Sequence, residues 1–133
     1  MEVPPDFALV PNLSPFLETV GPIHVRDDGD ELVLGLRAEE RHVNHRGTVQ
    51  GGLLSTFADF ALGRAIEADA EDDRDRATVS LTIDFLKPAK PGAWIESRTR
   101  VDRERAVGKG ERAPDPVDGR EIVRARGVWV VAG

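Results

Sequence analysis

The sequence predicts an α+β domain in which one long helix packs against a mainly antiparallel sheet. Residues 51–69 have the clearest helical period, and several other segments alternate as strands do. The 133 residues are enough for one hydrophobic core, and 40% of them are apolar and 32% charged, as in folded globular proteins. We therefore expect a single domain over residues 1–133.

The N-terminal part of the chain predicts a short helix followed by a hairpin. Residues 13–20, LSPFLETV, place Ser14 at the N-cap and Pro15 at the first helical position. The next segment, IHVRDDGDELVLGLR, has a DDGD turn signal between two short extended runs. We expect two antiparallel strands there.

The long helix is predicted by the spacing of its apolar residues. One broad face carries Leu53, Leu54, Phe57, Ala58, Ala61, Leu62, Ala65 and Ile66. Phe60 lies nearly opposite this face, and an exposed aromatic side chain there suggests that a second surface, such as another subunit, covers it. The acidic stretch that follows, EADAEDDRDR, is expected to be a solvated loop.

Three strand-like segments follow the helix. The first, ATVSLTIDFLKP, alternates strictly, and one face carries Val79, Leu81, Ile83 and Phe85. The other two are AWIESRTRV and EIVRARGVWVV. Between them, residues 102–119 have the weakest pattern, for which we expect a short, weak strand and a DG turn that opens the last strand.

Composition and motifs exclude several classes of function. A net charge of −6 argues against a nucleic-acid binder, and the absence of cysteine excludes thiolate chemistry. The first residues, MEVPPDFALVPNL, contain no export signal, and no apolar run approaches the roughly 20 residues of a membrane helix. We expect a cytoplasmic protein with no nucleic-acid or membrane partner.

Two common hydrolase or metal signatures are also missing. No serine lies in a Gly-x-Ser-x-Gly elbow. His42 and His45 lie near Glu39 and Glu40, but without tight helical pairing they are interpreted as solvated loop histidines. No metal or redox cofactor is expected.

The residues that precede the long helix predict a site for an oxygen atom. Gly51 and Gly52 leave the helix start bare, and the first amides of a helix are unpaired and lie in positive potential. Alone, this pattern also fits a plain turn.

Asp59 lies eight residues after Gly51, or about 12 Å along the axis, so one carbonyl cannot easily touch both in one chain. If they cooperate, two chains with antiparallel helices must supply them.

The stretch NHRGTVQGGLLSTFADFALG resembles a motif of the hotdog-fold acyl-CoA thioesterases of the phenylacetate-pathway type. Their pattern is Asn, a short gap, Gly, His-Gly-Gly, a helix, and an Asp eight residues after the first of those glycines. TVSLTIDFLKPAKPG is similar to their strand that ends in Pro and a following Gly. The resemblance extends from about residue 14 to the end of the chain and is weaker over 102–118.

This resemblance implies a curved antiparallel sheet around the 51–69 helix, and a homodimer or dimer of dimers with active sites at the subunit interface. Gly51 would offer its amide to the thioester carbonyl, and the partner's Asp59 would be the nucleophile or the base that activates water. Asn44 would position the water or the acyl group. Thr78, placed by its distance before Pro88, would match an assisting hydroxyl residue.

The departure from the family pattern is Gln50, because the family usually has His there. Gln can orient neighbours through hydrogen bonds but cannot carry a proton near neutral pH. The resulting hypothesis is an acyl-CoA thioesterase that uses the carboxylate and helix amides. Its alternatives are a non-catalytic acyl-CoA binder and, less favoured without a histidine in the helix or later strands, a dehydratase or hydratase.

Candidates for the CoA phosphates are Lys87, Lys90, Arg98 and Arg100, although solubility explains each of them better.

Overall fold

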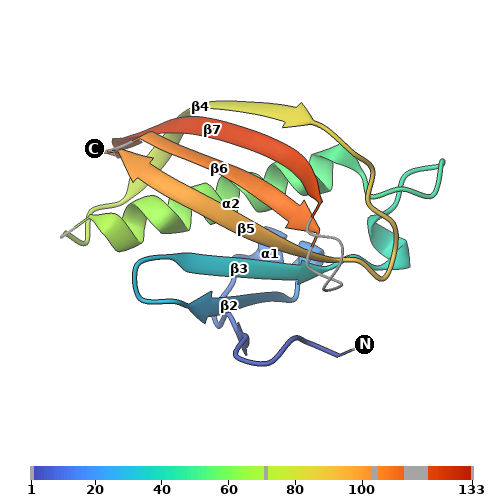
Figure 1. Cartoon of the computed structure of the whole chain (residues 1–133). Coiled ribbons are helices and arrows are strands. Elements are labelled where there is room, and N and C mark those ends of the chain that lie inside the picture. Colours follow the sequence, from blue (N-terminus) through green and yellow to red (C-terminus); the bar gives the residue numbers. More distant parts are fainter. Residues whose placement is uncertain (1, 71, 103–104, 113–119, 133) are drawn as a thin grey trace.

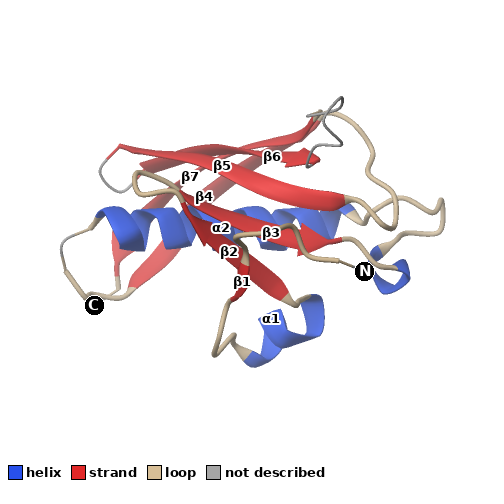
Figure 2. Ribbon diagram, turned by 60° about the horizontal axis from the view of Figure 1, so that its bottom comes forward, coloured by secondary structure: helices blue, strands red, loops and turns tan. Residues whose placement is uncertain are grey.

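The computed structural model describes residues 2–70, 72–102, 105–112 and 120–132. In chain order the elements are β1 (Ala8–Leu9), α1 (Pro15–Val20), β2 (Ile23–Asp27), β3 (Leu32–Arg37), the 3-10 turn η1 (Glu40–His42), α2 (Gly51–Asp69), β4 (Arg76–Phe85), β5 (Trp94–Asp102), β6 (Arg105–Arg112) and β7 (Glu121–Val131). The strands form one sheet in the order β1-β2-β3-β5-β6-β7-β4, and neighbouring strands are antiparallel. Figures 1 and 2 show α2 packed along one face of the curved sheet.

The short helix and the hairpin near the N-terminus form as predicted. Ser14 is the N-cap of α1, and its hydroxyl accepts a hydrogen bond from the Leu17 N–H at 3.3 Å. In the β2–β3 turn, Asp27 accepts a hydrogen bond from the Gly29 N–H at 2.8 Å, and Gly29 has a φ of 89°. Glycine adopts this left-handed conformation readily because it has no Cβ, so Gly29 fits the turn that the DDGD signal predicted.

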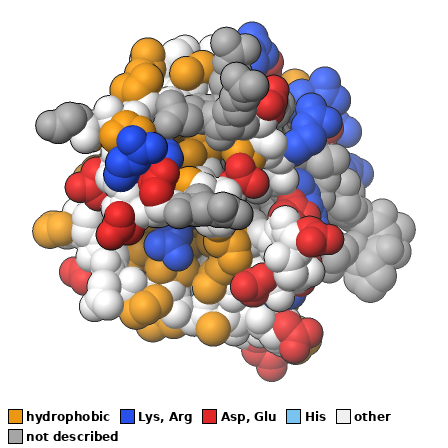
Figure 3. All heavy atoms as spheres, turned by 90° about the vertical axis from the view of Figure 1, so that its left-hand side faces the viewer, with side chains coloured by type: hydrophobic (Ala, Val, Ile, Leu, Met, Phe, Trp, Pro, Cys, Tyr) orange, Lys and Arg blue, Asp and Glu red, His pale blue; other side chains and the backbone are white. Residues whose placement is uncertain are grey.

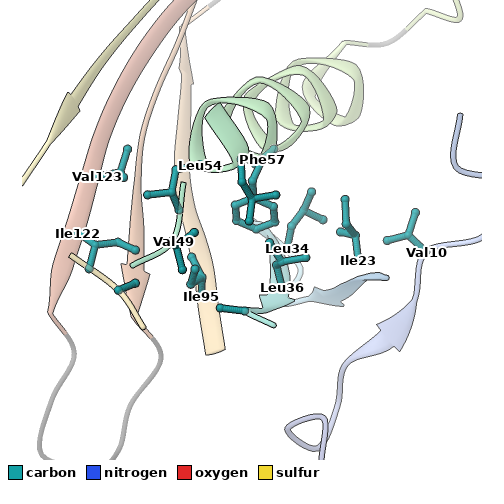
Figure 4. Close-up of a cluster of buried hydrophobic side chains, with 14 residues drawn as sticks. Val10, Ile23, Leu34, Leu36, Val49, Leu54, Phe57, Ile95, Ile122 and Val123 are labelled. Carbon is teal, nitrogen blue, oxygen red and sulfur yellow. The ribbon is translucent and has the colours of Figure 1, made fainter. Parts of the chain in front are cut away.

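The apolar face of α2 forms the core with the sheet. Of the predicted residues, Ala58 is half-buried and the others are buried: Leu53, Leu54, Phe57, Ala61, Leu62, Ala65 and Ile66. Figure 4 shows Leu54 and Phe57 projecting from α2 among side chains of the sheet, including Ile95. Phe60 was expected to be exposed; it is half-buried and packs against this core.

The alternation predicted for β4 is interrupted near the start of the strand. Leu81 and Ile83 pack against the smaller apolar cluster formed by α2 and β7, as expected. Phe85 also lies on the side of α2, against Gly51, although it is 55% exposed. Val79, however, is 60% exposed. Val79 lies at a β-bulge, since Thr78 pairs with Trp129 and Ser80 already pairs with Val128. The extra residue interrupts the two-residue period that the sequence pattern assumed.

The segment with the weakest sequence pattern forms a full strand. β6 has eight residues and pairs on one side with β5 and on the other with β7, so the prediction of a short, weak strand underestimated it. Cross-strand hydrogen bonds from two neighbours stabilise a segment of low intrinsic preference. The predicted DG turn before β7 lies outside the described residues.

His42 was expected to be a solvated loop residue, and the structure corrects this interpretation. Its side chain is buried; Nδ1 accepts a hydrogen bond from the Glu39 N–H at 2.9 Å, and Nε2 lies 2.8 Å from the Val20 carbonyl. These contacts join η1 to the end of α1. A histidine with both ring nitrogens engaged by backbone groups can be buried without an unpaired polar atom.

Most of the described residues in the acidic stretch over 67–76 are exposed, as expected, and α2 ends at Asp69, where the helical period of the sequence ends. Figure 3 faces the end of the molecule where α2 finishes, and Asp and Glu side chains are spread over it.

Among the described residues, no helix is long and apolar enough to cross a membrane.

Candidate active site

The start of α2 presents two backbone amides without partners. Gln50 is the N-cap, and its carbonyl accepts hydrogen bonds from the Leu53 and Leu54 N–H groups at 3.0 and 3.2 Å. Within the described chain, the N–H groups of Gly51 and Gly52 have no hydrogen-bond acceptor. These donors, together with the helix dipole, can stabilise negative charge on an oxygen atom. The exposed Gln50 side chain makes no capping hydrogen bond.

Asn44 organises the loop that leads into α2. Its Oδ1 accepts hydrogen bonds from the Arg46 N–H at 2.9 Å and the Thr48 N–H at 3.3 Å, and its Nδ2 donates to the Thr48 hydroxyl at 3.1 Å. Gly47 completes this turn with a φ of 80°. The Asn44 side chain therefore fixes the loop beside Gly51, and one of its two amide hydrogens remains for another acceptor.

The helix start opens into a cleft, called here the Gly51 cleft. It has a volume of about 620 Å³, within the range of small-molecule sites. The lining residues that matter below are Asn44, Arg46, Gly51, Leu54, Phe85 and Lys87. The ring of Phe85 forms a wall, because a Cβ added to Gly51 would lie 3.4 Å from it.

Sequence analysis missed two of these residues and misjudged others. Arg46 was not considered, although it follows Asn44 by two positions and lies in the same turn. Phe85 was placed on one face of its strand with Leu81 and Ile83, but not at the site. Among the candidates for the CoA phosphates, Lys87 lines the cleft. Arg98 does not line it; this residue lies on β5 and donates a hydrogen bond at 3.3 Å to the buried Glu96 of the same strand. No histidine lines the cleft.

Asp59 and Thr78 form a second group of polar atoms. The Thr78 hydroxyl donates a hydrogen bond to Asp59 Oδ1 at 2.8 Å. The bulge at Val79 makes this possible: Thr78 lies opposite Trp129, and directly opposed residues share a face of the sheet. Because Trp129 is buried against α2, Thr78 also faces the helix. Without the extra residue, alternation from Leu81 would turn Thr78 away.

The five predicted site residues therefore form two separate groups in one chain. Gly51 and Asn44 line the cleft, with Gln50 adjacent in sequence, whereas Asp59 and Thr78 do not line it. Eight residues of helix, about 12 Å, separate Gly51 from Asp59. Among the described residues no group of three or more His, Cys, Asp or Glu is placed to hold a metal ion.

Comparison with known sequences identifies related proteins. A family model for the thioesterase superfamily matches residues 46–106. The "Putative esterase PA0474" of Pseudomonas aeruginosa is 44% identical over 104 residues, which cover 77% of this chain and 78% of that protein. Acyl-coenzyme A thioesterase 13 of Mus musculus is 32% identical over 66 residues, covering 50% of this chain and 46% of the mouse protein.

Solved structures share the fold at lower identity. The PaaI protein from the phenylacetic acid degradation operon of E. coli is 20% identical, with a TM-score of 0.70 and coverage of 90% of this chain and 86% of that one. Zebra fish thioesterase superfamily member 2 is 24% identical, with a TM-score of 0.70 and coverage of 90% and 88%. Together with the sequence relatives, these structures confirm the predicted resemblance: the chain belongs to the thioesterase superfamily and has the hotdog fold.

Proposed function

We propose that this protein is an acyl-CoA thioesterase that hydrolyses a thioester to a free acid and CoA. One observation carries the proposal: the unpaired Gly51 amide opens into a cleft, while the Asp59–Thr78 pair lies about two helical turns away. Thioester hydrolysis needs a donor to the carbonyl oxygen, which the Gly51 amide can supply, and a nucleophile or base, which the Asp59 carboxylate can supply. The proposed enzyme is a homo-oligomer, a dimer or a dimer of dimers, in which each active site combines the two halves from different chains.

The exposed edge of the sheet supports pairing of two chains. β4 is the last strand of the sheet, so within the described residues one of its edges has no neighbouring strand. Its Val79 and Phe85 are exposed, as is Val130 on the adjacent β7. Long apolar edge strands favour association with another chain. Two chains that meet with antiparallel α2 helices would bring Gly51 of one near the partner's Asp59.

The proposed reaction uses few groups because a thiolate is a good leaving group. The thioester carbonyl accepts a hydrogen bond from the Gly51 N–H, which stabilises the oxyanion when the carbonyl carbon is attacked. The partner's Asp59 either attacks that carbon or takes a proton from the attacking water. The C–S bond then breaks and CoA leaves as the thiolate. If water attacks, this step gives the free acid directly. If Asp59 attacks, the acyl group stays on its carboxylate as a mixed anhydride, which water then hydrolyses to the free acid. Thr78 holds the carboxylate by its hydrogen bond.

The charges at the Gly51 cleft favour a CoA carrier. Arg46 and Lys87 come from two different loops and both line the cleft. They give it two cations in a chain whose net charge is −6. Cations of this kind attract the phosphate groups of CoA. Gln50, exposed beside the helix start, can donate to the substrate but cannot titrate.

The test is release of free thiol from acetyl-, hexanoyl-, decanoyl- and phenylacetyl-CoA by the wild type and Asp59→Asn. Asn keeps the size of the side chain and can still accept a hydrogen bond from Thr78. We expect turnover by the wild type, and a decrease of about a hundredfold or more in kcat in the variant. Turnover that is the same in both proteins would remove Asp59 from the mechanism.

A second candidate function is acyl-CoA binding without turnover. The observation that favours it is Gln50, which replaces the family's titratable residue at the helix start. Binding of acyl-CoA by calorimetry, with no thiol release from the whole panel, would favour this function over hydrolysis. The cytoplasm stays the predicted compartment for either activity.

A further inference from the structure

We propose that Leu54 limits the length of the acyl group, because it separates the Gly51 cleft from an apolar cavity between α2 and the sheet. The proposal rests on the proposed function, since it assumes that a thioester carbonyl is bound at the Gly51 amide. It adds a substrate class: short or compact acyl groups. Leu54 acts on specificity and takes no part in the chemistry.

Leu54 lines two hollows at once. It lines the Gly51 cleft, three residues after the glycine whose amide is unpaired. It also lines the apolar cavity, together with Phe57, Ala58 and Ala61 from the same helix face. Leu54 is only 6% exposed, although it is shared by the walls of the cleft and of the cavity. Figure 4 shows it directed from α2 into the interior.

The cavity behind Leu54 has the shape and chemistry of a pocket for an alkyl chain. Its helix side runs from Leu54 to Leu62, about 12 Å along the axis. Small side chains, Ala58, Ala61 and Ala125, leave the space open. The one buried hydroxyl in its wall, Ser97, already accepts a hydrogen bond from the Leu34 N–H at 2.9 Å.

The cavity is too small in its present form for a long acyl chain. Its volume is about 20 Å³, room for roughly one water molecule. An acyl chain that enters from the Gly51 cleft must first displace Leu54. Truncation of Leu54 would join the two hollows, because a protein core relaxes only partly around a deleted side chain. Cavities lined by apolar groups then accept apolar ligands.

The test compares Leu54→Ala with a control variant, Leu53→Ala. The control removes the same atoms from a neighbouring buried leucine, but Leu53 lines neither the cleft nor the cavity. The measured quantity is kcat/KM for decanoyl-CoA divided by that for acetyl-CoA. We expect the wild type to prefer acetyl-CoA or hexanoyl-CoA, and Leu54→Ala to raise the ratio by at least about tenfold. Leu53→Ala should leave the ratio near the wild-type value. Leu54→Val, a milder change, should shift it in the same direction if the alanine variant does not fold.

Three results would overturn the proposal: a wild-type preference for decanoyl-CoA, an unchanged ratio in both Leu54 variants, or an equal shift in Leu53→Ala. Calorimetric binding of non-hydrolysable thioether analogues of the same chain lengths separates this proposal from the proposed function. A shift in relative Kd without any thioester turnover would support the role of Leu54 and contradict hydrolysis. Absence of both turnover and binding would contradict both proposals.

Discussion

At the scale of single residues, Gly51 contributes its N–H to the proposed site rather than the space left by a missing side chain. A Cβ at this position would make ordinary contact, at 3.4 Å, with the Phe85 ring. Gly51 is also the first residue of α2, a position that proline tolerates, and Gln50 before it has the extended backbone, φ −60° and ψ 132°, that a following proline requires. The N–H can therefore be removed while the helix is kept.

We predict that Gly51→Pro and Gly51→Ala have opposite effects on turnover. The proline variant loses the donor to the oxyanion, so its kcat should fall by about a hundredfold or more. The alanine variant keeps the N–H and should stay within about fivefold of the wild type. Steady-state thiol release measures both. Equal losses in the two variants would mean that space at residue 51, and not its amide, determines activity.

Thr78 is predicted to act through Asp59. Thr78→Val keeps the shape of the side chain and removes the hydrogen bond to the carboxylate, so kcat should decrease about tenfold or more while KM changes little. Thr78→Ser restores the hydroxyl and should recover most of the turnover. A rise in KM in the valine variant, without loss of kcat, would instead place Thr78 among the groups that bind substrate.

At the scale of elements, the sequence predicts part of β4 but not its register against β7. Its alternation predicted a strand and the inward positions of Leu81 and Ile83 correctly. It could not predict the bulge at Val79, because an extra residue is revealed by the register against β7, which is distant in sequence. The same bulge turns Thr78 towards Asp59, so the feature that broke the pattern also formed the polar pair.

In the other elements too, features set by local sequence signals were predicted, and features set by distant contacts were not. α2 was predicted from end to end because its apolar period and glycine-rich start are local signals. The two burials that were missed, His42 and Phe60, depend on contacts with segments elsewhere in the chain. The Gly51 cleft combines loops before α2 and after β4, which is why Arg46 and Phe85 were not recognised. The single domain over 1–133 stays a prediction.

The loop between α2 and β4 is held by Asp72. Hydrogen bonds from the Arg76 guanidinium, at 2.8 and 3.0 Å, and from Arg74 keep the pKa of Asp72 well below its ordinary value. A carboxylate with a lowered pKa in the folded state stabilises the protein above the pKa of the unfolded state, and this contribution is lost as the pH falls through the folded pKa.

We therefore predict that Asp72→Asn lowers the free energy of unfolding near neutral pH and that its difference from the wild type shrinks below about pH 4. Urea unfolding across this pH range measures the difference. Asp73→Asn, at an exposed neighbour that makes no side-chain hydrogen bond in the described chain, is the control and should show little difference at any pH. A difference for Asp72→Asn that stays constant down to about pH 2 would contradict a role for its charge.

At the scale of the whole molecule, the account depends on two chains sharing each active site. The Gly51 amide and the Asp59 carboxylate lie about eight residues of one helix apart, while β4 leaves a sheet edge and two apolar side chains exposed. In the proposed dimer, a second copy with its α2 antiparallel would account for both features. In the proposed dimer, each pair of chains would contain two sites, and each site would take its amide from one chain and its carboxylate from the other.

The most direct measurement is complementation between two inactive variants, Asp59→Asn and Gly51→Pro, expressed together with different affinity tags. A mixed dimer has one site with an intact Gly51 amide from the first chain and an intact Asp59 carboxylate from the second. With random association of equal amounts, thiol release should recover to about a quarter of the wild-type rate. A mixture no more active than the two variants measured separately, with mixed dimers isolated by both tags, would contradict an active site shared between chains.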